Sequence, residues 1–214
     1  MRILHIPPTP KALIFDLDST LYEHREYALF QSRVLIERLA RERGEPFHAI
    51  EAEIEGIRAA RLAAGLGATS LGNIFLELGV DIKTSVRWRI EAIEPSVWLE
   101  VDPKLRAALE FLTKHYSLAL VTNNPRIVGE KSLRTLGVRD LFAQVIGLDD
   151  TMRSKPDAAP FTLATVRLGL PAAAFVSIGD REEVDLLPAR GLGMGAILIE
   201  AVADVYKLPE ALNP

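Results

Sequence analysis

The sequence of 214 residues contains no cysteine. Disulfide bonds, thiol nucleophiles and zinc–thiolate sites are therefore excluded. Asparagine and glutamine are scarce as well, with four and two residues respectively. Such scarcity is typical of heat-adapted proteins, although a biased genomic base composition explains it equally well.

A basic tail and a long apolar run are also missing. The net charge is −4, which argues against binding to nucleic acid through its phosphate backbone. Apolar runs stay below the about 18 residues of a membrane span, and the one near the start is short and followed by Pro7 and Pro8, unlike a signal peptide. We therefore expect a cytoplasmic protein with no membrane partner, while the oligomeric state stays open.

The remaining composition, 49% hydrophobic and 25% charged, is ordinary for a globular protein that buries a core. The apolar run at residues 12–15 predicts a buried strand, which ends in the carboxylates of Asp16 and Asp18. Three prolines lie in residues 1–11, so we expect no regular structure there.

Residues 23–93 have a helical pattern with almost no strand signal. The first predicted helix ends at Gly44, and the second carries Pro46 in its first turn. A third helix is predicted from about Ser70 to Leu78, and Asp81 suits the N-cap of a fourth. These features predict an all-helical insert.

From residue 104 onward, predicted helices and strands alternate. The expected strands cover residues 117–121, 144–146, 175–178 and 196–199, and helices lie between them. This alternation is typical of a parallel sheet with helices on both faces. We therefore predict an α/β protein with a Rossmann-like parallel sheet core, at residues 1–22 and 95–214, and an inserted all-helical domain at residues 23–94.

Polar residues follow the predicted strands, at the edge of the sheet where open α/β folds bind ligands. The four groups, in chain order, are Asp16 with Asp18; Thr122 with Asn123 and Asn124; a polar loop at 149–156 that contains Lys155; and Gly179-Asp180 with Asp185. Carboxylates without softer ligands suggest Mg²⁺. A cation, a lysine and backbone amides suit a phosphoryl group, and a carboxylate beside them can act as a nucleophile.

With these four groups in this order, the chain resembles the haloacid dehalogenase-like hydrolase superfamily. Its four signatures correspond to residues 16–20, to Thr122, to Lys155 before Pro156, and to Gly179-Asp180 with Asp185. The resemblance covers residues 12–22 and roughly 96–200. It implies that the insert is a helical cap, which we expect to lie as a lid over the carboxyl ends of the strands.

The resemblance also implies a role for each position. Asp16 would attack phosphorus and form an aspartyl-phosphate, and Asp18 would protonate the leaving oxygen and then activate water. The substrate phosphate would be held by Thr122, Asn123, Lys155 and the backbone amides near Leu17 and Asp18. Mg²⁺ would be bound by Asp16, the carbonyl of Asp18 and Asp180, with Asp185 either a ligand through water or a group that orients Lys155.

Other interpretations stay open for individual residues. Thr122 alone would be a plain strand-end hydroxyl, and Asp185 fits a helix cap or a structural ion pair equally well. Arg181 and Val184 depart from the residues that are common in the family at these places. We expect three further pairs of residues to be structural: Arg153 and Arg181 on the surface, His24 and Arg25 at a solvated helix start, and Trp88 and Trp98 in packing.

The presence of Asp18 decides which reaction of the superfamily is predicted. In a dehalogenase the leaving group is a halide, which departs without a proton. In a phosphatase the leaving group is an alkoxide, which needs a general acid such as Asp18. Phosphonate-cleaving relatives use a lysine of the cap. The only lysine in the insert is Lys83, and Asp18 is present, so this reaction is disfavoured. We therefore predict a Mg²⁺-dependent phosphatase for a small phosphate monoester, such as a sugar phosphate or a nucleotide. The alternatives are a phosphomutase of the same fold and a catalytically quiet binding module.

Overall fold

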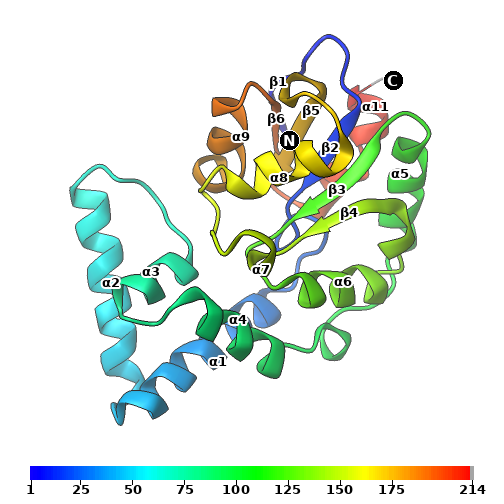
Figure 1. The fold of residues 1–214 in the computed structure, drawn as a ribbon. Coiled ribbons are helices and arrows are strands. Elements are labelled where there is room, and N and C mark those ends of the chain that lie inside the picture. Colours follow the sequence, from blue (N-terminus) through cyan, green and yellow to red (C-terminus); the bar gives the residue numbers. More distant parts are fainter. Residues whose placement is uncertain (213–214) are drawn as a thin grey trace.

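The computed structural model describes residues 1–212, which contain a six-stranded sheet in the order β1-β6-β5-β2-β3-β4 (Figure 1). The strands are β1 (Arg2–His5), β2 (Ala12–Phe15), β3 (Ser117–Val121), β4 (Phe142–Ile146), β5 (Phe175–Gly179) and β6 (Gly195–Leu198). All neighbours are parallel except β1, which pairs antiparallel with β6. The polar groups after β2, β3, β4 and β5 therefore reach the same edge of the sheet.

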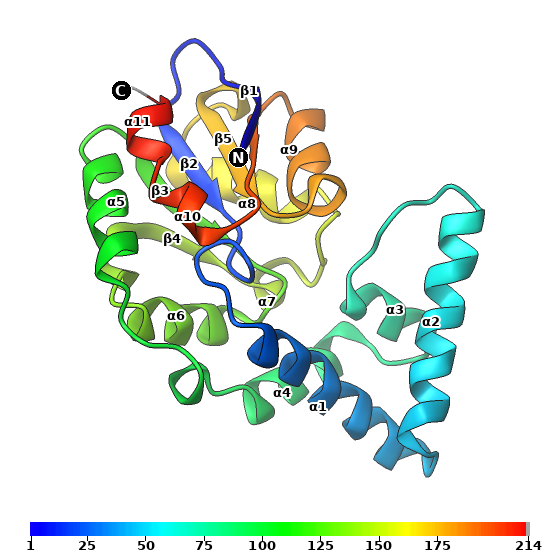
Figure 2. The ribbon, with the colours of Figure 1, turned by 180° about the vertical axis from the view of Figure 1, so that it is seen from behind.

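Helices cover both faces of the sheet because its central strands are apolar on both sides. Leu13 and Phe15 belong to one core cluster and Ala12 and Ile14 to another. The first cluster includes residues of α5 (Pro103–Thr113), α6 (Arg126–Thr135), α10 (Val202–Val205) and α11 (Leu208–Leu212), some of which lie in front of the sheet in Figure 2. The second includes residues of α8 (Ala159–Leu168) and α9 (Leu187–Gly191).

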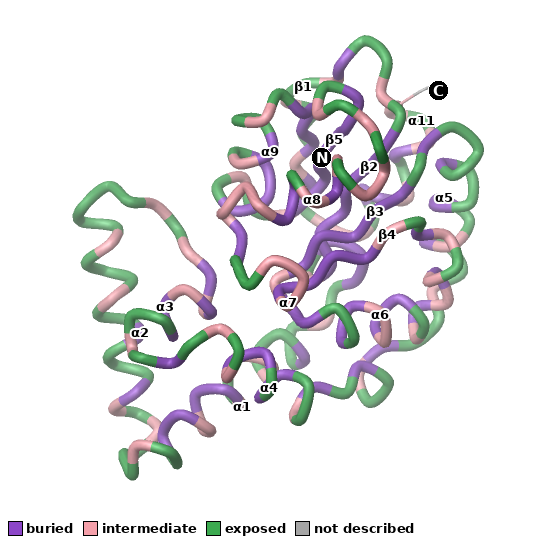
Figure 3. Tube along the Cα trace, in the orientation of Figure 1, coloured by how far each residue is buried: buried purple, intermediate pink, exposed green. Residues whose placement is uncertain are grey.

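Four helices follow β2, as the sequence predicted: α1 (Arg25–Arg43), α2 (Phe47–Ala63), α3 (Leu71–Glu77) and α4 (Ile82–Ala92). Gly44 ends α1 in the left-handed region with φ of 68°, where glycine is favoured. The side chains of Ser70 and Asp81 cap α3 and α4. These helices share a separate core cluster around Trp88, and much of α2 is exposed (Figure 3).

Helices α1–α4 lie beyond the carboxyl ends of the strands, where a lid was predicted (Figure 1). Gln31 of α1 donates to Asp18, and Ser70 beside α3 shares a hydrogen bond with Ser154. The domain boundaries at residues 22/23 and 94/95 and the movement of the lid stay predictions. Within residues 1–212, no helix is long and apolar enough to cross a membrane.

Two expectations about local structure were wrong. Residues 1–11 are not irregular throughout, because β1 pairs with β6, and the N-terminal amine binds Asp204 at 2.7 Å. Strand β1 lies at the edge of the sheet and is largely exposed, and its short apolar run before Pro7 and Pro8 was not enough to predict it. The loop predicted at 149–156 begins inside a short helix, α7 (Leu148–Thr151), whose N-terminal Gly147 amide donates to Asp150.

Candidate functional site

Asp16 is the first residue beyond β2, and its side chain is enclosed at the middle of the sheet. Its backbone amide donates to the carbonyl of Ile178 on β5, which continues the strand pairing by one residue. The residue is 5% exposed. Beyond it, the amides of Thr20 and Leu21 donate to the carbonyl of Leu17, so the chain turns sharply. Ser19 lies in this turn with φ of 61°, a left-handed region that favours glycine over other residues.

Lys155 lies between two carboxylates and is 1% exposed. Its Nζ donates to Oδ1 of Asp16 at 2.5 Å and to Oδ1 of Asp185 at 2.6 Å. Burial alone would lower the pKa of Lys155, but the charges of Asp16 and Asp185 outweigh it and raise that pKa. Burial raises the pKa of Asp16 to about 7, against the opposing charge of Lys155. The lysine is therefore the fixed cation of this site.

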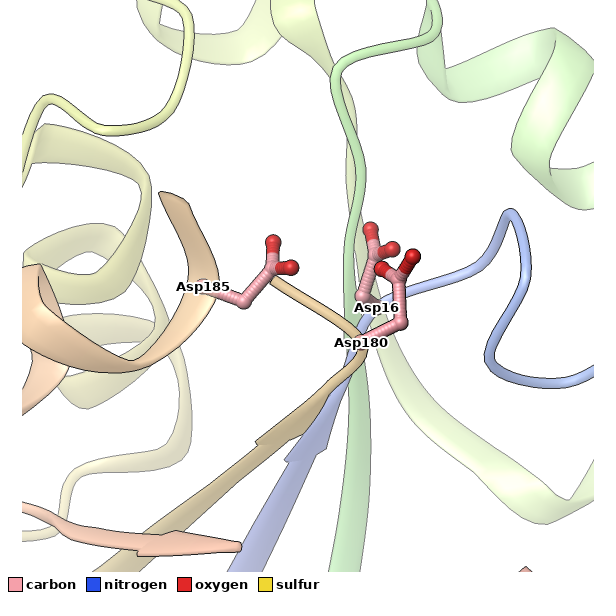
Figure 4. A group of neighbouring side chains, drawn as sticks. All are labelled: Asp16, Asp180 and Asp185. Atoms are coloured by element: carbon pink, nitrogen blue, oxygen red, sulfur yellow. The ribbon is translucent and has the colours of Figure 1, made fainter. Parts of the chain in front are cut away.

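Asp180 and Asp185 complete an acidic group with Asp16. Figure 4 shows Asp16 and Asp180 with their carboxylates close together, while Asp185 reaches in from the π-helix Glu182–Leu186. One oxygen atom of each of these three residues lies within 4.8 Å of the others. Gly179 allows this approach, because a Cβ there would lie 2.5 Å from Cβ of Asp185.

Two oxygen atoms of the acidic group have no hydrogen-bond partner among residues 1–212. They are Oδ2 of Asp16 and Oδ1 of Asp180, and both are buried. Burial also raises the pKa of Asp180. A buried carboxylate oxygen without a partner is costly, and a hard divalent cation satisfies it. The carboxylates of Asp16 and Asp180 are therefore suited to bind Mg²⁺. Asp185 differs from them, because both of its oxygen atoms already accept hydrogen bonds, from Lys155 and from the amide of Arg181.

Thr122 and Asn123 directly follow β3, and the structure brings them to the same edge. The hydroxyl of Thr122 is buried and accepts a hydrogen bond from the amide of Asn124 at 3.1 Å. The Asn123 side chain accepts from the Lys155 amide at 2.7 Å and donates to the Lys155 carbonyl at 3.2 Å. Asn123 therefore fixes the backbone of Lys155, a structural contact that the sequence did not predict.

Asp18 faces the cap helices, and three side chains donate to it. Oδ1 accepts from Gln31 at 2.8 Å and from the hydroxyl of Tyr22, while Oδ2 accepts from Asn124 at 3.0 Å. Gln31 also accepts from Asn124 at 2.9 Å, which closes a polar network between α1 and the sheet edge. Sequence reasoning missed Gln31 and Tyr22. The one signal for Gln31 is a polar amide on the predicted amphipathic helix, in a chain with few glutamines.

The structure also places the residues that were expected to be structural. His24 caps α1 by accepting from the amide of Tyr27, and Trp98 stacks on Tyr27 with ring centroids 5.8 Å apart. Trp88 is buried in the core of the cap, as predicted. Arg181 is partly exposed but lines the same cavity as Asp18 and Asp180, so it is not simply a surface residue.

Comparison with known proteins places this geometry in context. A family model described as haloacid dehalogenase-like hydrolase matches residues 10–193. A phosphoglycolate phosphatase of Cereibacter sphaeroides is 31% identical over 209 residues, 92% of this chain and 89% of the relative. A phosphoglycolate phosphatase of Pseudomonas syringae pv. tomato is 28% identical, over 88% of this chain and 69% of the relative. A phosphatase structure from Thermococcus onnurineus has the same fold, with a TM-score of 0.61, 23% identity, and coverage of 94% of this chain and 97% of that one.

Proposed function

Because the chain belongs to the haloacid dehalogenase-like hydrolase family, we propose a role for each site residue in phosphate-ester hydrolysis. The protein is a Mg²⁺-dependent phosphatase, and its substrate is a small phosphorylated metabolite. One observation carries the proposal. Asp16 has one oxygen held by Lys155 and the other without a partner among residues 1–212, beside the equally unpartnered oxygen of Asp180.

Asp16 is the nucleophile. A carboxylate oxygen of Asp16 attacks phosphorus, the bond between phosphorus and the ester oxygen breaks, and an aspartyl-phosphate forms. Lys155 lies within hydrogen-bond distance of Asp16, so it holds the carboxylate in place and offsets the charge that gathers around phosphorus. Asp185 holds Lys155 from the other side at 2.6 Å.

Asp18 is the general acid and base. It gives a proton to the departing ester oxygen, which leaves as an alcohol, and it then takes a proton from the water that attacks the aspartyl-phosphate. Inorganic phosphate and free Asp16 result, so Asp18 ends the cycle protonated as it began. The donors Gln31 and Asn124 hold its carboxylate at 2.8 and 3.0 Å.

The phosphate oxygens are held by groups at the sheet edge. The Thr122 hydroxyl accepts from the Asn124 amide, so its own proton is available to a phosphate oxygen. The backbone amides near Leu17 and Asp18 and that of Asn123 supply further donors. Mg²⁺ would be held by Asp16, Asp180 and the carbonyl of Asp18, and when bound it neutralises charge on the phosphoryl group.

We further propose that the substrate is a small phosphorylated carboxylic acid of the phosphoglycolate type. The two relatives described above are phosphoglycolate phosphatases, and the first is 31% identical to this chain. The cavity between cap and core has a volume of about 280 Å³, at the low end of small-molecule sites. A molecule as small as phosphoglycolate fits within this volume.

A panel of phosphate esters tests these proposals. We expect Mg²⁺-dependent release of phosphate from phosphoglycolate, with lower kcat/KM for a hexose phosphate and a nucleoside monophosphate. Asp16→Asn should abolish release, whereas Asp140→Asn, at an exposed carboxylate paired with Arg106, should not. An isomerised phosphate ester in place of free phosphate would point to the phosphomutase, and absence of both products would point to the binding module.

A further inference from the structure

The cap contains a charged side chain that none of these steps uses. Arg89 of α4 is 6% exposed, and it is the one buried arginine among residues 1–212. Its hydrogen bonds run from Nη1 to the hydroxyl of Ser85, one turn earlier, and at 3.5 Å to the Ser85 carbonyl. Within the part of the chain that the structure describes, no carboxylate forms an ion pair with it.

Arg89 lines the cavity above the catalytic edge. That cavity is shared with Gln31 and Ser70 from the cap and with Asp18, Asn124 and Asp180 from the core. The cation therefore stands on the cap side of the space, opposite the carboxyl ends of the strands. A small substrate whose phosphate lies against the core would extend its other end toward this wall.

A buried cation without a counter-ion is costly, so such residues usually have a partner. Burial lowers the pKa of Arg89 to about 10, which leaves the guanidinium charged at neutral pH, and the charge of Asp18 partly opposes this shift. Asp18 already accepts three hydrogen bonds from other groups. The planar guanidinium keeps donors on Nε and Nη2 that match the two oxygen atoms of a carboxylate.

We propose that Arg89 binds the carboxylate of the substrate and so selects phosphorylated carboxylic acids over phosphate esters of similar size that lack a carboxylate. This assignment rests on the proposed function, because it needs the phosphate to be placed at Asp16. A carboxylate is favoured over a second phosphate because the cavity offers one cation that no carboxylate pairs, whereas Arg181 already lies 3.8 Å from Asp180 and 3.9 Å from Asp185. One guanidinium balances the single charge of a carboxylate.

The test compares two substrates of similar size. Phosphoglycolate carries the carboxylate, and 2-hydroxyethyl phosphate replaces it with a neutral hydroxymethyl group. In the wild-type enzyme, kcat/KM should favour phosphoglycolate. In Arg89→Met the ratio of kcat/KM for the two substrates should fall about 10²–10³-fold, mainly through KM, because a charged, bidentate contact is lost. Arg87→Met, at an exposed arginine of the same helix, should keep the wild-type ratio.

Each other outcome has a defined meaning. An unchanged ratio in Arg89→Met, or an equal loss on both substrates, would make Arg89 structural and overturn the assignment. A larger loss with a bisphosphate than with phosphoglycolate would assign Arg89 to a second phosphate and would overturn the carboxylate. If Arg89→Met does not fold, Arg89→Lys replaces it, since it keeps the charge and should lower the ratio about tenfold. Failure of the wild-type enzyme to release phosphate from either substrate, or from any other ester of the panel, would instead refute the proposed function itself.

Discussion

Replacing Asp18 by asparagine tests whether this carboxylate is the general acid and base. The substitution keeps the size of the side chain and leaves the backbone carbonyl that would contact Mg²⁺. It replaces one carboxylate oxygen by an amide nitrogen, so the side chain can no longer give or take the proton. If Asp18 acts as proposed, the two half-reactions of the enzyme should respond differently to the change.

The structure sets the size of the two effects. An asparagine whose oxygen takes the place of Oδ1 keeps the hydrogen bonds from Gln31 and Tyr22, and its amide then faces the amide of Asn124. One broken hydrogen bond of this kind costs about 1–3 kcal/mol of stability, which leaves the domain folded. Loss of general acid and base catalysis costs about 10²–10⁴ in rate, or roughly 3–5.5 kcal/mol of barrier.

The assay compares an alkyl and an aryl phosphate. An alkyl phosphate needs a proton on its leaving oxygen, so Asp18→Asn should lose about 10²–10⁴ in kcat/KM with it. The aryl group of p-nitrophenyl phosphate leaves largely unaided, so Asp16 should still be phosphorylated. Hydrolysis of the aspartyl-phosphate should then be slow. Rapid mixing should show a burst of about one equivalent of nitrophenol per site, with phosphate retained on Asp16.

Equal losses on both substrates, without a burst and without phosphorylated enzyme, would refute the acid and base role and leave Asp18 a positioning residue. Unchanged turnover would remove it from the site. Tyr22→Phe is the matched control, because it deletes one donor to Asp18 and keeps the carboxylate. We expect Tyr22→Phe to lower kcat/KM by less than about tenfold and to show no burst.

Three further predictions concern the metal and the packing of the site. Exhaustive chelation should abolish phosphate release, Mg²⁺ should restore activity and raise the melting temperature, and Ca²⁺ should inhibit because its coordination is larger and looser. Lys155→Met leaves Asp16 and Asp185 without their cation, so denaturant titration without Mg²⁺ should show a loss of about 3–5 kcal/mol, smaller when Mg²⁺ is added. Gly179→Ala should cost about 1–3 kcal/mol in the same titration because its Cβ would collide with Asp185, whereas Gly56→Ala, with open space at that position, should be neutral or stabilising.

The sheet and the insert could be predicted because local signals agreed with the fold. Strand β2 is apolar on both sides and ends in carboxylates, a pattern that a central parallel strand requires. Gly44 and Asp81 occupy the helix ends that their conformations favour. The meeting of Asp16 with Lys155 followed from the rule that ligand sites lie at the carboxyl ends of such strands.

Contacts between the cap and the core could not be predicted in the same way. Periodicity places a residue on one face of a helix but does not say which partner that face meets. Gln31 lies 93 residues from Asn124 in the sequence, and no local pattern connects them. Arg89 did leave a trace, since it lies three residues after the buried Val86 on α4, where an apolar side chain would be expected. Strand β1 left only a short apolar run, Ile3 and Leu4, and the prolines that follow it argued against regular structure.

The contacts between cap and core explain how one carboxylate can serve both half-reactions. Departure of an alcohol from phosphorus is favoured in a closed site that excludes water, whereas hydrolysis of the aspartyl-phosphate needs water at Asp18. In the structure, polar contacts join the cap to the core, among them Ser70 with Ser154 at 2.7 Å and the Ala68 amide with Glu183 at 2.5 Å. Each contributes about 0.5–1.5 kcal/mol net. Separation of the cap from the core therefore costs a few kcal/mol from these contacts, so we expect the site to open and admit water within each catalytic cycle.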